Sequence, residues 1–190
     1  MIVFNGFKGE EDEGEKTKWK FVYQRQSVGV NCIAWKDDKS GDFVTSTRKV
    51  GALRYWNVAT NEPKQVVKVG SHGIHLLRKL KNDRKRLLIA FTNGAVCVFK
   101  TAKKRVEFQT EAGHAETVFD LEFCPSNKDL IASCSYDGTV RVWDANSMKL
   151  LQTNETLRNT PLSKEEKHII YSISWHPKDP KIVSNAKELL

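Results

Sequence analysis

The chain has 190 residues, of which 39% are hydrophobic and 28% are charged. This composition is typical of a soluble globular protein and is sufficient for one sizeable core. No apolar run approaches the ~20 residues that a membrane-spanning helix needs. The first residues lack the basic, apolar and small-residue regions of a signal peptide. A cytoplasmic location is therefore expected, with a nuclear one as the alternative.

Charge is distributed unevenly along the chain. The formal net charge is +8, yet residues 10–15 form an acidic run. Between Arg78 and Arg105 there are ten Lys or Arg residues and a single acid, Asp83. Such asymmetry indicates separate surfaces with separate partners. Residues 1–17 are polar and charged, and they are predicted to form a mobile acidic tail.

A repeat runs through the rest of the chain. Residues 51–56, 94–99 and 138–143 each begin with glycine, continue with alternating apolar residues and end in a large aromatic. Their first glycines recur at intervals of 43 and 44 residues. This period is typical of four-stranded propeller blades, which repeat every ~40–45 residues.

The remaining segments also repeat, and they predict strands. Residues 30–35, 118–123 and 170–175 alternate between apolar and other residues, as strands with one buried face do. A second family of short apolar strands is predicted at 43–46, 87–91 and 130–134. Asn93-Gly94 and Asp137-Gly138 are strong hairpin signals. No segment has a convincing helical period, so the predicted fold is all-β.

We therefore expect a partial β-propeller in the form of an open arc. About three complete four-stranded blades are predicted at residues 28–69, 74–110 and 113–152, within a propeller segment spanning 18–190. An incomplete blade is predicted at 168–184, and residues 18–25 are expected to supply the last strand of a preceding blade. Because propellers need about 4–8 blades, the remaining blades are expected to come from missing sequence or from another chain. Alternatively, open strand edges would make the chain oligomeric or prone to aggregation.

The third unit resembles the WD-repeat family. It contains Gly113-His114, Asp137-Gly138 and Trp143-Asp144 at the spacing of that family's signature. The other units are degenerate, with Trp56-Asn57 and Phe99-Lys100 in place of Trp-Asp. The resemblance implies a propeller fold and a non-catalytic scaffold or adaptor that binds other proteins.

The resemblance also implies a structural tetrad of hydrogen-bonded side chains in the third unit: His114, Ser133, Asp137 and Trp143. A buried indole N–H and a buried imidazole both need partners, and a serine hydroxyl can bridge them. The alternative interpretation is a Ser-His-Asp catalytic triad, which is disfavoured because the serine is expected inside the blade. No enzyme activity, cofactor or metal site is predicted, and the four cysteines are interpreted as small core residues.

Comparison with the family also suggests which residues face the upper rim of the propeller, where partners bind. The predicted contact residues are Asn31, His75, Thr117, Phe119, Tyr136 and Tyr171. Exposed aromatic residues are typical interface anchors. The alternative is that one or two of them pack against the adjacent blade.

A basic patch is predicted on the opposite, lower face, where the connections of the second unit should meet. Its residues are Arg78, Lys79, Lys81, Arg84, Lys85, Arg86, Lys103, Lys104 and Arg105. Such a patch could contact RNA or another acidic surface, which makes a nucleic-acid- or polyanion-binding subunit the alternative function. A merely solvated face is the other interpretation. Steep salt dependence of binding would favour the polyanion.

Overall fold

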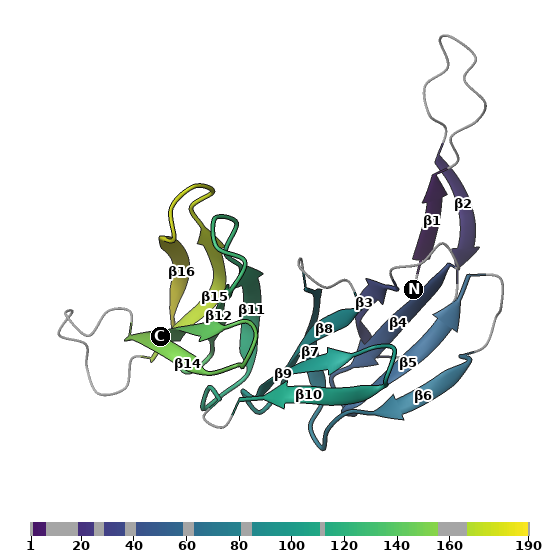
Figure 1. Ribbon diagram of the computed structural model, residues 1–190, viewed down its shortest axis with the longest axis horizontal. Helices are drawn as coiled ribbons and strands as arrows, with labels where there is room; N and C mark the ends of the chain where they lie inside the picture. The colour runs from purple at the N-terminus through teal and green to yellow at the C-terminus, as the bar shows by residue number, and fades with distance from the viewer. Residues whose placement is uncertain are drawn as a thin grey trace, which may run out of the picture.

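A computed structural model describes residues 2–6, 19–24, 29–36, 41–58, 63–80, 85–110, 113–155 and 167–189. The regular elements in these ranges are all strands, which confirms the predicted all-β class. Figure 1 shows separate small sheets that follow one another along an open arc. No helix in the described part of the chain is long and apolar enough to cross a membrane.

Three four-stranded antiparallel sheets form the blades, and each has its strands in chain order. The first blade contains β3 (Val30–Trp35), β4 (Asp42–Thr47), β5 (Ala52–Asn57) and β6 (Gln65–Lys68). The second contains β7 (Ile74–Lys79), β8 (Arg86–Phe91), β9 (Val96–Lys100) and β10 (Arg105–Gln109). The third contains β11 (Val118–Phe123), β12 (Leu130–Ser135), β13 (Thr139–Asp144) and β14 (Leu150–Glu155).

The position of each strand in its blade follows from its side chains. The second strand of every blade is an inner strand of its sheet and is buried almost throughout. The outer strands β6 and β10 are largely exposed, which agrees with their polar residues. Gly94 and Gly138 occupy the tight turns between second and third strands with φ of 86° and 79°. Only glycine adopts this left-handed conformation without strain, so these two positions close the hairpins.

Two-stranded sheets stand at both ends of the arc (Figure 1). At one end β1 (Ile2–Gly6) pairs with β2 (Trp19–Gln24), and at the other β15 (Lys167–Trp175) pairs with β16 (Ile182–Leu189). Residues Ile2–Gly6 fall within the segment 1–17 that was predicted as a mobile tail, and the structure places them in strand β1, paired with β2. The acidic run at 10–15 lies outside the described residues. β16 also extends past residue 184, where the incomplete blade was expected to end.

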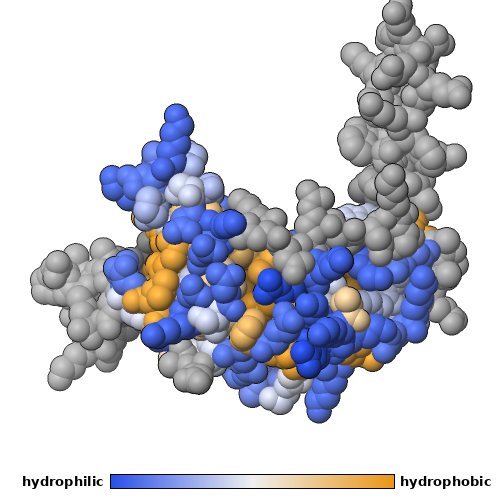
Figure 2. All heavy atoms as spheres, in the orientation of Figure 1, coloured by the Kyte–Doolittle hydropathy of each residue, from blue (hydrophilic) through white to orange (hydrophobic). Residues whose placement is uncertain are grey.

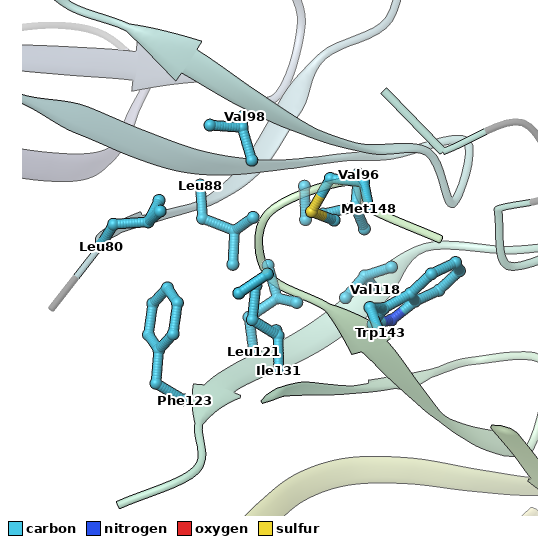
Figure 3. Close-up of a cluster of buried hydrophobic side chains, with 12 residues drawn as sticks. Leu80, Leu88, Val96, Val98, Val118, Leu121, Phe123, Ile131, Trp143 and Met148 are labelled. Carbon is cyan, nitrogen blue, oxygen red and sulfur yellow. The ribbon is translucent and has the colours of Figure 1, made fainter. Parts of the chain in front are cut away.

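The hydrophobic core lies between blades. Figure 3 shows side chains of the second blade meeting those of the third, with Trp143 at one end of the cluster. The labelled residues are Leu80, Leu88, Val96, Val98, Val118, Leu121, Phe123, Ile131, Trp143 and Met148. A second cluster joins the first blade to the second, and a third joins the third blade to β15. Each blade is thus stabilised by its neighbours, as in other repeat arrays.

The backbones of adjacent blades also approach closely, and glycine makes this possible. The N–H of His114, before the first strand of the third blade, donates to the carbonyl of Gly94 in the second blade at 3.0 Å. A Cβ atom on Gly94 would lie 2.0 Å from the carbonyl oxygen of His114. One on Gly73 would lie 1.6 Å from the carbonyl oxygen of Arg48. Neither junction has room for a side chain.

Candidate protein-interaction site

The structure brings the four tetrad residues together inside the third blade. The indole Nε1–H of Trp143 donates to Ser133 Oγ at 2.7 Å. Ser133 Oγ lies 2.6 Å from Nε2 of His114, and Nδ1 of His114 lies 3.0 Å from Asp137 Oδ2. Thr139, which the sequence did not single out, adds a hydroxyl that donates to Asp137 Oδ1 at 2.7 Å. The network therefore links β12, the turn that follows it, β13 and the segment that precedes β11.

The donor and acceptor properties of these groups determine the direction of each hydrogen bond in the network. The indole can only donate, and the Asp137 carboxylate can only accept. Nδ1 of His114 therefore carries the proton toward Asp137, and the Ser133 hydroxyl donates to Nε2. Burial lowers the pKa of His114 and outweighs the opposing effect of the Asp137 carboxylate, so the imidazole is neutral at pH 7. Burial alone would raise the pKa of Asp137, but hydrogen bonds from His114 and Thr139 lower it well below its usual range.

The same geometry bears on the triad interpretation. Ser133, His114 and Asp137 have the order of contacts that a hydrolytic triad shows. However, Ser133 has no exposed surface, and its oxygen already accepts from Trp143. A nucleophile in this position cannot meet a substrate, so the contacts among these three side chains serve the structure of the blade.

The other two blades carry reduced versions of the network. In the first blade Trp56 Nε1–H donates to Thr45 Oγ1 at 2.8 Å, and Thr45 occupies the place of Ser133. In the second blade Ile89 and Phe99 occupy the serine and tryptophan places, and both are fully buried. The first blade thus keeps one hydrogen bond of the network, and the second replaces it with apolar packing.

Replacing Asp137 with alanine is expected to lower the free energy of unfolding by about 1–3 kcal/mol, because the buried N–H of His114 loses its acceptor. Denaturant melts of the wild type and the variant at pH 7 measure the difference. Asp179→Ala is the control, because the Asp179 side chain is 41% exposed and its ion pair among the described residues is with the exposed Lys181. It should change stability by less than about 0.5 kcal/mol. Equal melting of Asp137→Ala and the wild type would contradict the structural role of the network.

Acid should weaken the fold through the same histidine. Because burial lowers the pKa of His114 in the folded state, the unfolded chain takes up a proton first as the pH falls. The stability linked to His114 is therefore fully present above its unfolded pKa of about 6.5 and is lost as the pH falls below that value. Melts between pH 7.5 and 5 should show falling stability in the wild type. The slope should flatten in His114→Gln, and an unchanged slope would exclude His114 as its source.

The predicted upper-rim residues share one structural feature. In the first strand of each blade, and in β15, the pairing register slips once, and the residue at the slip is Asn31, His75, Phe119 or Tyr171. A bulge of this kind leaves one residue unpaired and re-aims its side chain. The repeated bulge therefore turns one side chain from each of these strands toward the same rim.

Two of these side chains, His75 and Tyr171, meet Phe119 together with Tyr136. The Phe119 ring contacts His75 edge-on with centroids 5.5 Å apart, and it lies 4.9 Å from the ring of Tyr171 and 6.2 Å from that of Tyr136. Beside these rings is a hollow of about 340 Å³ with a mainly apolar lining. Its lining residues are Arg48, His75, Thr92, Glu116, Thr117, Phe119 and Tyr136. Three blades thus contribute to one rim hollow, the name used for this site below.

The exposure of the rim residues differs from the sequence prediction. Tyr171 is exposed, whereas Phe119 and Tyr136 are half-buried. His75 was predicted as an exposed contact, which was wrong: its ring is buried because Phe119 of the next blade covers it. Asn31 is half-buried and donates to the backbone carbonyl of His75, so it joins the first two blades. Thr117 similarly donates its hydroxyl to the carbonyl of Thr92 at 2.8 Å.

Sequence reasoning missed two residues of the rim hollow, Arg48 and Glu116. The search used the residue before the turn aspartate as its landmark in each unit. In the first unit, where Val50 replaces that aspartate, this position is Lys49, so Arg48 one residue earlier was not included. Glu116 lies just before β11, outside the family positions that were compared.

The basic patch is partly neutralised. Lys81 and Arg84 lie outside the described residues. Arg78 was placed on a lower connection, but it ends up in β7, where it pairs with Asp120 of the next blade at 3.4 Å. Arg86 lies 3.9 Å from Glu107, which also pairs with Lys100 at 3.4 Å.

The other end of the patch is more open. Lys104 donates to Gln65 and lies over the ring of Tyr55, 5.6 Å from its centroid. Lys85, Lys103 and Arg105 are exposed, and Lys79 is half-buried. Figure 2 shows that hydrophilic residues dominate the visible face of the second blade. The patch is therefore a charged, solvated surface interrupted by acids, and it is less dense than the sequence indicated.

Comparison with known proteins adds to this geometry. The family model "WD domain, G-beta repeat" matches residues 105–144, which run from the outer strand of the second blade through three strands of the third. Ribosome biogenesis protein YTM1 of Debaryomyces hansenii is 29% identical over 142 residues, covering 72% of this chain and 29% of that protein. Glutamate-rich WD repeat-containing protein 1 of Dictyostelium discoideum is 29% identical over 124 residues, covering 63% of this chain and 26% of that protein. The chain thus spans less than a third of these curated relatives.

Among solved structures, the WD40 β-propeller domain of Doa1 superposes with a TM-score of 0.66 at 18% identity. The superposition covers 87% of this chain and 51% of that domain's chain. At this identity the likeness concerns the fold. Residues 105–144 therefore resemble a WD repeat, and the chain has the fold of part of a WD40 β-propeller.

Proposed function

We propose that the chain is a non-catalytic protein-interaction module and that the rim hollow is its contact site. The observation that carries this proposal is the convergence of one bulge residue from each of several strands on a single aromatic cluster. Aromatic residues and arginine are enriched at the energetic centres of protein interfaces. A hollow of about 340 Å³ is also within the usual size range of binding pockets.

We further propose that the module works within a multi-protein assembly of the kind to which its relatives' names refer. YTM1 proteins are named for ribosome biogenesis, and several of them match this chain at 24–36% identity. A propeller in which the Ser133 hydroxyl is buried and hydrogen-bonded within a blade is suited to holding other components together. Of the two expected locations, the nuclear one agrees with this role, because eukaryotic ribosomal subunits are assembled largely in the nucleus.

A resemblance to one particular WD-repeat protein remains a prediction. Residues 41–45, 50–58, 113–120, 135–138 and 170–175 resemble WD repeat-containing protein seventeen, a large propeller protein of animals and protists. The relatives reported above carry other names. Both likenesses support the same role as an interaction platform.

The test is affinity capture with paired rim and control variants. Tyr171 in β15 and Phe108 in the outer strand β10 are both aromatic and both 41% exposed, so they form a matched pair. The Tyr171→Ala chain should lose the partners that the wild-type chain captures from cells of its source. The Phe108→Ala chain should retain them. Partners that survive Tyr171→Ala and vanish with Phe108→Ala would place the contact on the outer strands and overturn the proposal.

The same design addresses the polyanion alternative. Changing Lys103, Lys104 and Arg105 to glutamate reverses charge at exposed residues of the basic patch. If the rim is the contact site, this chain should capture the same proteins as the wild type. Capture that depends on these three residues and falls steeply with salt would instead support the nucleic-acid- or polyanion-binding function.

A further inference from the structure

The rim hollow has charges of opposite sign on opposite walls. Arg48 reaches it from the turn between β4 and β5 of the first blade, and Glu116 reaches it from the segment before β11 of the third. Both residues are exposed. Among the residues that the structure describes, neither the Arg48 guanidinium nor the Glu116 carboxylate has an ion-pair partner. Each is therefore available to a ligand.

The charge of Arg48 acts directly on His75, which also lines the hollow. His75 lies there with a buried ring, and burial lowers its pKa, with a further lowering from the charge of Arg48. The ring is therefore neutral at pH 7 and adds no competing charge. Lys49, exposed beside Arg48, adds a second cation to the same turn. A negative group entering from the first blade would find an attractive field over a partly desolvated surface.

The apolar part of the hollow favours an aromatic or large aliphatic side chain instead of a charged one. Phe119 and Tyr136 present rings with centroids 6.2 Å apart and tilted by 50°, and neither residue is fully buried. Rings in this arrangement favour an additional aromatic or large aliphatic side chain placed edge-on or offset against them. A hollow of about 340 Å³ holds one such side chain with part of its backbone.

We propose that the rim hollow binds an extended peptide segment in which a large apolar side chain is flanked by an Asp or Glu. The apolar side chain packs against Phe119 and Tyr136, and the acidic side chain pairs with Arg48. Glu116 disfavours an acid on the opposite side and so sets the direction of the peptide. This inference rests on the proposed function, since it names the partner chemistry of the same site.

The experiment is selection from a fully randomised displayed peptide library on the complete 190-residue chain. Four chains are compared: wild type, Arg48→Glu, Glu116→Gln and Tyr136→Ala. Arg48 and Glu116 are exposed and unpaired, so their variants should fold, and a thermal melt of each chain verifies this. Glu116→Gln is the control for Arg48→Glu, because it alters a charge on the same hollow without touching the wall that is proposed to bind the acid.

The wild-type chain should enrich peptides that combine an aromatic or large aliphatic residue with a neighbouring Asp or Glu. Arg48→Glu should weaken those peptides by at least about tenfold, the loss expected of a charge-assisted contact, and should enrich Lys or Arg at the same position. Glu116→Gln should keep the acidic preference, and Tyr136→Ala should lose the enriched peptides altogether.

Two results would overturn the inference, and they separate it from the proposed function. Peptides that depend on Tyr136 but show no acidic preference, or keep it in Arg48→Glu, would refute the acidic specificity and leave the rim as the contact site. A selection that yields no peptide dependent on Tyr136 would refute both.

Discussion

Truncating Trp143 to alanine is expected to lower the free energy of unfolding by about 3–5 kcal/mol, the usual cost of removing a large core side chain. Trp143 is 1% exposed and belongs to the cluster between the second and third blades (Figure 3). Its removal opens a cavity at that junction and also leaves Ser133 without its indole donor. The effect should therefore extend beyond the third blade to its contact with the second.

Two further variants separate packing from hydrogen bonding in denaturant melts. Trp143→Phe keeps most of the ring but removes the N–H, so it should cost about 1–3 kcal/mol. Trp35→Ala removes a tryptophan that is 46% exposed, and it should cost clearly less than Trp143→Ala. Equal losses for Trp35→Ala and Trp143→Ala would show that Trp143 has no special place in the fold.

Gly94→Ala is expected to cost more than about 2 kcal/mol, from two causes that add. Its φ of 86° lies in the left-handed region, where a side chain costs about 1–2 kcal/mol. The new Cβ would also lie 2.0 Å from the carbonyl oxygen of His114, so the junction of the second and third blades must move. The hydrogen bond from His114 N to Gly94 O would be strained by the same movement.

Gly29→Ala is the matched control for this substitution. Gly29 has a φ of 79°, but a Cβ there would meet no atom within 4 Å. Its variant should show the backbone cost alone, so the difference between the two variants measures the steric conflict between blades. Melting temperatures and denaturant midpoints of both chains provide the measurement. Equal destabilisation by the two changes would mean that the blade junction yields without cost.

Much of the fold was predictable from local signals. The spacing of the glycines, the two turn dipeptides and the alternating strands predicted three four-stranded blades and an open arc, which the structure confirms. The strand Ile2–Gly6 was not predicted, because five residues beside a long charged segment carry little periodic signal. Its existence depends on pairing with β2, a contact that the local sequence does not encode.

The site was less predictable, because its properties arise between blades. The family pattern identified Phe119 and Tyr171 as rim positions, but the burial of His75 depends on a ring 44 residues further along the chain. The basic patch was overestimated for the same reason. Positive residues are visible in the sequence, whereas the pairing of Arg78 with Asp120 appears only when two blades pack together.

The Asp120 carboxylate has a second set of contacts, and these contacts affect the cooperativity of folding between blades. Asp120 Oδ1 accepts from Arg78 of the second blade, while its Oδ2 accepts from the hydroxyl of Ser172 and the N–H of Ile173 in β15, each at 3.4 Å. A single side chain thus connects three successive units of the array. Models of repeat proteins treat stability as a sum over nearest neighbours. Here Arg78 and Ser172, which belong to next-nearest units, donate to different oxygens of one carboxylate and together fix its orientation, so substitutions at these two positions should be non-additive although their side chains do not share a blade.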